Sequence, residues 1–223
     1  MAIKDEKLLA KFAEYRSQFP SEHEDYVWAA VAEYFSTVVS DGARALAAWH
    51  KACTLNKEWS PHHLGHAKAL IQAHKWMQAV AELDACAELE CVGLEPERFE
   101  QNDLYLLGYA LFGACRFKEA AEAWRAAGNR IRYWGDAEPL KQFHLHRGWA
   151  HHLERNFLEA IDAYKRALVA PGPGDTDFDD AMDADEVEVC QERLNPTIER
   201  YYELASAGEL LEAGELKAMP YIR

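Results

Sequence analysis

Residues 116–127 read RFKEAAEAWRAA, and residues 156–167 repeat the same pattern as NFLEAIDAYKRA. In both segments an aromatic residue is followed by alanine after three positions, by a second aromatic residue after four more, and by another alanine after three more. Steps of three and four place these side chains on one face of an α-helix. The small alanines on that face let a neighbouring helix come close. The two segments therefore predict two equivalent helices, forty residues apart.

The same spacing occurs twice more, nearer the N-terminus, and each of the four copies is preceded by another amphipathic stretch. Neither helix of such a pair can bury its apolar face alone, whereas stacked pairs can. The sequence therefore predicts four helix pairs with a tight turn inside each. The two upstream copies consist of Trp76, Ala79, Leu83 and Cys86 and of Gly42, Ala45, Trp49 and Ala52.

The first and third pairs carry the most complete pattern. Their first helices contain Trp28, Val31, Ala32 and Phe35, and Leu104, Leu107, Gly108 and Leu111. This arrangement resembles the tetratricopeptide repeat, whose signature has Trp, then Leu-Gly, then Ala and an aromatic residue. The first copy needs a turn one residue longer. The second copy has His63, His66 and Ala67 at the Trp, Leu and Gly positions, and the fourth has His144 and Arg147 at the first two.

The resemblance covers roughly residues 22–170 and implies an all-α fold, a right-handed superhelix of about four helix-turn-helix repeats. Capping helices usually cover the open faces of terminal repeats. We expect an N-terminal capping helix within residues 1–21 and C-terminal capping helices within 189–223, with an acidic loop at 171–188. The repeats themselves are expected at about 22–56, 60–90, 101–131 and 139–170.

The composition excludes several classes of partner. Among 223 residues, 38 acidic and 24 basic side chains give a net charge of −14, which argues against nucleic acid and anionic membranes as partners. No stretch is apolar and long enough to cross a membrane, and the start of the chain lacks the apolar core of a secretory signal. Five cysteines at spacings unlike those of zinc ribbons favour a reduced, cytoplasmic protein.

In tetratricopeptide arrays the first helix of each pair usually lines a concave groove that holds peptides, so the resemblance implies a groove here. Aromatic side chains there would anchor a partner. The alternative is that they pack against the next helix or a capping helix. If they line a groove, Tyr109→Ala with Trp149→Ala should abolish partner binding without loss of stability. The predicted partner-binding residues are Lys68, Asn102, Tyr105, Tyr109, Phe112, Gln142, Leu145, Trp149 and His152.

The chain has ten histidines, several of them clustered. His62 and His66 stand four apart, a spacing that can bind one metal ion on a helix. We interpret the clusters as packing and capping residues, so no metal and no cofactor are expected. The acidic segment from Asp175 resembles an EF-hand loop, but Asp180 replaces its central glycine. Phosphate-binding loops and nucleophile elbows are absent, so we expect no enzyme.

These patterns together predict a non-enzymatic protein–protein interaction module that acts as an adaptor, scaffold or co-chaperone. It would hold a peptide or helix of a partner that is basic or carries apolar anchors. The sequence is also compatible with self-association of the chain through its terminal helices. The alternatives are a secretion-type chaperone, a metal- or calcium-responsive regulatory subunit of an enzyme complex, and an enzyme whose histidines gather in a closed pocket.

Overall fold

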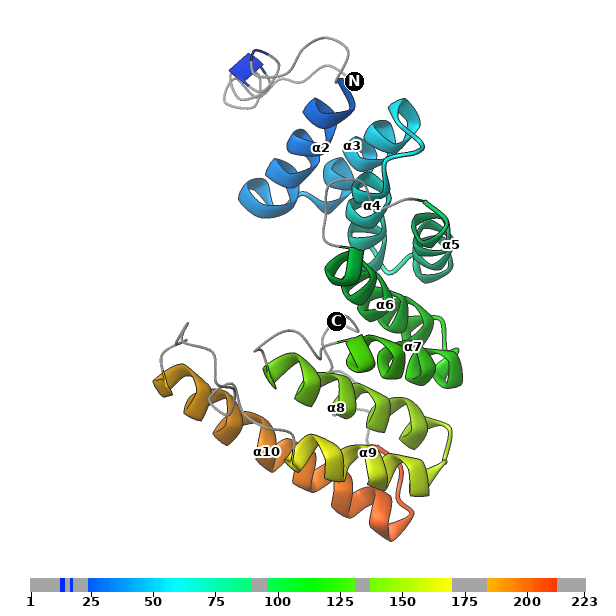
Figure 1. Ribbon diagram of the computed structural model, residues 1–223, viewed down its shortest axis with the longest axis vertical. Coiled ribbons are helices and arrows are strands. Elements are labelled where there is room, and N and C mark those ends of the chain that lie inside the picture. The colour runs from blue at the N-terminus through cyan, green and yellow to red at the C-terminus, as the bar shows by residue number, and fades with distance from the viewer. Residues whose placement is uncertain are drawn as a thin grey trace. The chain divides into compact units, whose positions relative to one another are not determined.

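The computed structural model consists, in its described part, of helices, and a short turn joins the two helices of each pair (Figure 1). It describes residues 13, 14, 17, 24–89, 96–130, 137–169 and 184–211, although nothing is described of the side chains of 96–102, 130, 137–140 and 184–194. The chain divides into two compact units, Met1–Leu94 and Glu95–Arg223. Each unit is a layered stack in which every helix packs against the next along the chain.

The first unit holds two helix pairs, and α2 packs on α3, α3 on α4, and α4 on α5. The core of the first pair includes Val31, Phe35, Ala45 and Trp49, which the predicted 3–4 spacing places on the buried faces. The elements are α2 (Glu24–Tyr34), the π-helix η2 (Phe35–Val39), α3 (Gly42–Leu55), α4 (Ser60–Gln72) and α5 (Trp76–Ala87).

The second unit contains two further pairs and a final helix. Here α6 packs on α7, α7 on α8, α8 on α9, and α10 lies against α9 and α8. Trp124 and Tyr164, the repeated aromatic residues of the two second helices, are completely buried. The helices are α6 (Pro96–Gly113), α7 (Phe117–Arg130), α8 (Ala137–Leu153), α9 (Phe157–Val169) and α10 (Ala184–Ala207).

All four turns inside the pairs share one backbone feature. Each has a non-glycine residue in the left-handed conformation, two positions before the second helix begins. In the last three turns, the following residue donates its N–H to the carbonyl five positions earlier, at 2.9, 2.8 and 2.9 Å. This is the Schellman motif, which ends a helix and satisfies its last carbonyls. The left-handed residues are Ser40, His74, Cys115 and Arg155.

The first pair accommodates its extra residue by a local change of helix type. Its first helix continues into the π-helical turn Phe35–Val39. The Asp41 N–H then bonds to the Phe35 carbonyl at 2.9 Å, one residue further back than in the other turns. A π-turn absorbs one inserted residue without breaking the helix. The longer turn expected for this copy is therefore a π-turn at the end of the first helix.

Close approach within the pairs of the second unit depends on glycine. A Cβ atom at Gly108 on α6 would lie 2.3 Å from Nε1 of Trp124 on α7. Forty residues later, a Cβ at Gly148 on α8 would lie 2.2 Å from Cε1 of Tyr164 on α9. No side chain fits at either position unless the ring moves. The contact between glycine and an aromatic ring thus repeats after forty residues, as the sequence pattern does.

The predicted all-α architecture of sequential antiparallel helix pairs is confirmed, and α10 packs on the last pair as a C-terminal capping helix would. This helix begins at Ala184, inside the segment 171–188 that we expected to be a loop. Most of the predicted N-terminal capping helix, and residues 171–183 of the acidic segment, lie outside the described residues. The repeat boundaries and the right-handed superhelix stay predictions.

Replacing Gly108 with alanine should lower the free energy of unfolding, because the new methyl group would collide with the buried Trp124 ring. Overpacking costs about 1–3 kcal/mol, whereas alanine gains roughly 1 kcal/mol over glycine from helix propensity. We expect a net loss in urea denaturation. Gly42→Ala is the matched control, since nothing lies within 4 Å of a Cβ at that helical position. A Gly108 variant that is as stable as the Gly42 variant would contradict this packing.

Candidate functional site

Five of the predicted partner-binding residues are buried, all of them on α6 and α8. Their side chains are between 0% and 5% exposed, so they do not face an open groove. This contradicts the expectation that they point away from the packed face. The structure agrees instead with the alternative that they pack against neighbouring helices. The five residues are Tyr109, Phe112, Leu145, Trp149 and His152.

The contacts of these side chains run between successive helices of the second unit. The Tyr109 ring lies 5.4 Å from the ring of Trp124 on α7 and 5.0 Å from that of His146 on α8. The Trp149 ring lies 4.7 Å from His146 and 6.2 Å from Tyr201 on α10. Since α8 packs on α7, α9 and α10, more than one of its faces is buried. A sequence pattern with one apolar stripe therefore cannot predict which residues of α8 are buried and which are exposed.

Truncating Trp149 should destabilise the protein instead of selectively removing a partner. Trp149 is 5% exposed, and Trp→Ala in a core costs about 3–5 kcal/mol. Gln142→Ala, on the same helix but half-buried, should cost about 1 kcal/mol or less, the value of one hydrogen bond. Urea denaturation of both variants tests this difference. If Trp149→Ala keeps the stability of the parent protein, the Trp149 side chain is not part of the core as described.

Two predicted residues remain partly accessible in the second unit. Tyr105 on α6 and Gln142 on α8 are half-buried, and the Tyr105 hydroxyl donates to Gln142 Oε1 at 3.2 Å. The Tyr105 and Tyr109 hydroxyls lie 2.9 Å apart, and the Tyr105 ring lies edge-on to Phe143 at 4.8 Å. The Tyr105 side chain is thus held rigidly with part of its surface exposed.

The other two predicted residues lie elsewhere. Lys68 is exposed on α4 of the first unit, as expected for a residue directed away from the packed face. The side chain of Asn102 lies outside the described residues. Among the described side chains, the surface that joins predicted partner-binding residues of two helix pairs consists of Tyr105 and Gln142. We call this pair the Tyr105–Gln142 surface.

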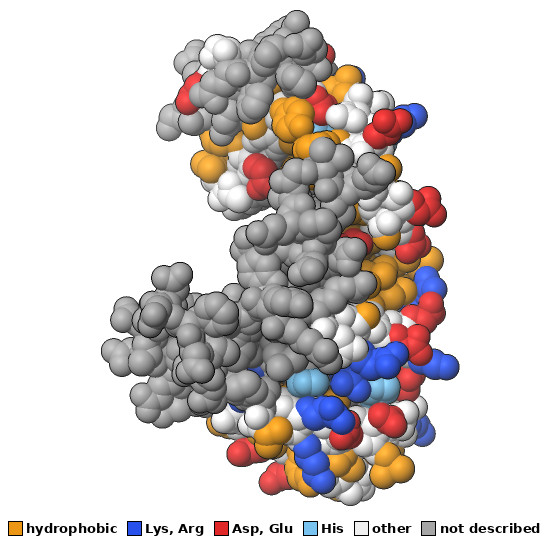
Figure 2. Space-filling model, in the orientation of Figure 1, with side chains coloured by type: hydrophobic (Ala, Val, Ile, Leu, Met, Phe, Trp, Pro, Cys, Tyr) orange, Lys and Arg blue, Asp and Glu red, His pale blue; other side chains and the backbone are white. Residues whose placement is uncertain are grey.

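Helices α7, α8 and α9 of this unit carry charged side chains of both signs. Figure 2 shows basic and acidic side chains mixed over α7, α8 and α9. Arg166 Nε donates to Asp162 Oδ2 at 2.8 Å, and burial together with the nearby Arg166 lowers the pKa of Arg147. Mixed charges of this kind are typical of a solvated face. An apolar anchor of a partner is better matched by the Tyr105–Gln142 surface.

A buried histidine lies directly beneath the Tyr105–Gln142 surface. His146 is 2% exposed, and its Nε2 lies 3.1 Å from the Tyr109 hydroxyl. Burial lowers the pKa of His146 to about 3, from 6.5 for an ordinary histidine. The ring is therefore neutral in the folded protein near neutral pH, whereas the unfolded chain takes up a proton below about pH 6.5.

We expect the free energy of unfolding to decrease as the pH falls from about 6.5 toward 3, by up to about 1.4 kcal/mol per pH unit from His146 alone. The sign follows because the unfolded state binds more protons in this window. His146→Gln cannot titrate and should decrease less steeply in urea denaturation between about pH 7 and pH 4.5. His144, whose pKa burial lowers to about 4, keeps part of the slope in this variant. An unchanged slope would contradict a buried neutral His146.

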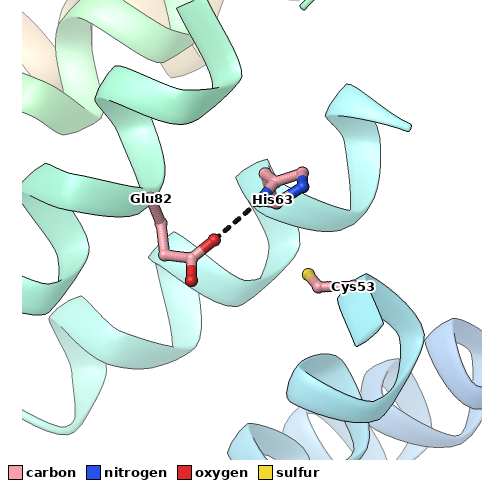
Figure 3. Close-up of side chains that lie close together, drawn as sticks. All are labelled: Cys53, His63 and Glu82. Carbon is pink, nitrogen blue, oxygen red and sulfur yellow. Dashed lines mark hydrogen bonds and ion pairs between the residues drawn. The ribbon is translucent and has the colours of Figure 1, made fainter. Parts of the chain in front are cut away.

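The first unit contains a cluster of chemically different ligand groups. Cys53 on α3, His63 on α4 and Glu82 on α5 each place one potential ligand atom within 4.8 Å of the other two (Figure 3). His63 Nδ1 lies 2.7 Å from Glu82 Oε2, and His63 Nε2 lies 3.0 Å from the Lys57 carbonyl. Cys53 is buried, and the other two side chains are half-buried. Three consecutive helices thus direct a thiol, an imidazole and a carboxylate to one point.

The electrostatics of this cluster, which we call the Cys53–His63–Glu82 cluster, follow from its partners. The hydrogen bond from His63, together with His66 close beside the carboxylate, lowers the pKa of Glu82 to about 2, and the hydrogen bond to Glu82 raises the pKa of His63. Burial and the charge of Glu82 raise the pKa of Cys53 to about 12. In the absence of another cation, Cys53 is therefore a protonated thiol and Glu82 is a carboxylate.

The histidine pair identified from the sequence is not the pair that the fold brings together. His62 is buried and binds Asp25 Oδ2 at 3.0 Å, and this same oxygen accepts a hydrogen bond from Asn56. His62 therefore links α4 to α2. His66 instead lies beside Glu82, with Nδ1 3.0 Å from Oε1. The spacing His63-x-x-His66 carried the signal, but Cys53 and Glu82 could be added only from the packing of α3 and α5.

The helix pairs of this chain match solved tetratricopeptide repeat structures. A MamA double mutant (RS-1 ArsTM) is 16% identical, with a TM-score of 0.57 over 73% of this chain and 82% of that chain. YrrB, described as a TPR protein with an unusual peptide-binding site, is also 16% identical, with a TM-score of 0.54 over 88% of each chain. No family model and no curated protein matches the sequence. At this level of identity the likeness establishes the tetratricopeptide fold.

This fold generally mediates protein–protein interactions and is typically non-catalytic. Within the described residues, none of the helices combines the length and apolar character needed to cross a membrane.

Proposed function

We propose that this chain is a non-enzymatic interaction module that holds a peptide or helix of a partner protein across the first helices of its repeats. The observation that carries this proposal is the Tyr105–Gln142 surface, where two such helices in neighbouring pairs are joined by a side-chain hydrogen bond. An adaptor, scaffold or co-chaperone role in the cytoplasm is part of the same proposal.

Tyr105 has the properties of an anchor for a partner. Its ring packs against Tyr109 at 4.9 Å and Phe143 at 4.8 Å, and its hydroxyl contacts two neighbouring side chains. A side chain that is already immobile loses little conformational entropy when a partner binds. Tyrosine also combines a large apolar surface with a polar end, and it is frequent among energetically dominant interface residues.

The charge of the chain supports a basic partner. With a net charge of −14, the protein attracts cationic segments and increases their rate of association. This long-range attraction acts on any part of the surface, whereas specificity requires a local anchor. A basic peptide that carries one aromatic or aliphatic residue fits both conditions. Lys68 would make a separate polar contact on the first unit.

Selection of peptides on the full-length chain tests this function, followed by titration calorimetry with the enriched peptide. Gln142→Arg places a bulky cation on the Tyr105–Gln142 surface and should weaken binding about tenfold or more, a loss of about 1.4 kcal/mol. Tyr105→Ala should cost about 2 kcal/mol of binding free energy, as an anchor residue does. Circular dichroism must show that both variants remain helical.

Leu158→Ser is the matched control, because Leu158 is 82% exposed on the second helix α9. It should leave the affinity unchanged. Binding that is lost in the Leu158 variant but retained in the Gln142 variant would transfer the site to the second helices. The same selection is run on an unrelated helical protein. If this chain enriches no peptide more strongly than that protein does, the proposed binding of peptides is contradicted.

A further inference from the structure

We propose that Cys53, His63 and Glu82 bind a divalent transition-metal ion of the zinc type. The proposal starts from geometry, because the three side chains come from α3, α4 and α5 and their ligand atoms lie within 4.8 Å of one another. Figure 3 shows the Glu82 carboxylate directed toward the His63 ring, with the Cys53 sulfur nearby. No other group of three such ligands is found within the described part of the chain.

The donor set matches the chemistry of zinc. Thiolate sulfur, imidazole nitrogen and carboxylate oxygen are the ligand types that zinc binds in proteins, whereas calcium and magnesium prefer oxygen alone. In a tetrahedral site with bonds of about 2.0–2.3 Å, ligand atoms are separated by about 3.5 Å. The Cys53 sulfur lies at most 4.8 Å from the other two ligand atoms, so it needs to approach them by about 1.3 Å at most. His63 Nδ1 and Glu82 Oε2, now 2.7 Å apart, need to separate by about 0.8 Å, and side-chain rotation supplies both movements. Water would occupy the fourth position.

Neighbouring groups already orient two of the three ligands. His63 Nε2 lies 3.0 Å from the Lys57 carbonyl, so its hydrogen points there and Nδ1 is left to face the ion. Donation of the distal N–H to a carbonyl is the usual way in which proteins orient a metal-binding histidine. His66 Nδ1 lies 3.0 Å from Glu82 Oε1, whereas the other oxygen, Oε2, faces His63. His66 is thus a positioning residue for the carboxylate.

The ion would take the place of two hydrogens, one on the Cys53 thiol and one between His63 and Glu82. Its entry releases the Cys53 thiol proton and the proton shared between His63 and Glu82, so that thiolate, neutral imidazole and carboxylate coordinate it. The bound ion would join α3 to α4 and α5, and so connect the two helix pairs of the first unit. A group that binds only the folded state raises the melting temperature as its concentration rises.

Cobalt(II) is the probe, because a thiolate bound to cobalt gives a charge-transfer absorption band that zinc lacks. The full-length chain, reduced and stripped of metal, is titrated with cobalt and followed by absorption and thermal melting. We expect one equivalent to give the band, zinc to remove it by displacement, and both ions to raise the melting temperature. Magnesium at the same concentration should change neither.

Three variants assign the ion to this cluster. Cys53→Ser should abolish the band, and Glu82→Gln should weaken cobalt binding about a hundredfold or more, since even the loss of a group that only orients a ligand costs 10- to 100-fold. Cys115→Ser is the matched control, because Cys115 is an exposed thiol outside the cluster, and it should behave like the parent. If Cys53→Ser does not fold, Glu82→Gln decides, since it retains every thiol.

Two results would overturn the proposal. The first is the absence of both a charge-transfer band and a melting shift at a hundredfold excess of cobalt over protein. The second is a band that persists unchanged in Cys53→Ser, which would place the ion on other thiols of the chain, or parental cobalt affinity in Glu82→Gln, which would exclude Glu82 as a ligand.

Discussion

The close approach of a small residue to a buried aromatic ring determines the geometry of this protein. At Gly108 and Gly148 the backbone of a first helix lies against the ring of Trp124 or Tyr164 on the second helix. These contacts leave no space for a Cβ, so they define both the distance between the helices and their rotation about their own axes. In the first unit Gly65 on α4 approaches Trp49 on α3 in the same way, but there the contact joins consecutive pairs.

The rotation of each first helix about its own axis determines which of its side chains remain accessible to a partner. Once glycine faces the ring of its own pair, residues such as Tyr109 and Trp149 point into the space between successive helices and become core. Tyr105 and Gln142 lie at the edge of that space and keep part of their surface. An array of this kind therefore offers a narrow rigid surface supported by buried aromatic residues, and the hydroxyl of Tyr109 connects that surface to His146 beneath it.

The fold could be predicted from the sequence because its signal is local and repeated. Steps of three and four, together with the period of forty, are sufficient to identify the second helices and their core residues. The register of the first helices could not be found in this way, since α8 is buried against three neighbours and has apolar residues on several faces. The left-handed turn residues were also hidden, because Ser40, His74, Cys115 and Arg155 share a conformation but no side-chain chemistry.

The departures from the repeat signature in the second copy place polar side chains where the signature has apolar ones. In the second copy, His63 stands at the position of the signature tryptophan and His66 at that of leucine, and both turn toward Glu82. A buried or half-buried ionic cluster is weak support for stability, since well-packed apolar residues at these positions would serve at least as well. Sequences that abandon a local packing rule usually do so at functional or strained sites. A polar cluster in which His63 takes the place of an apolar signature residue, and which brings thiol, imidazole and carboxylate together, therefore supports the proposed binding of an ion.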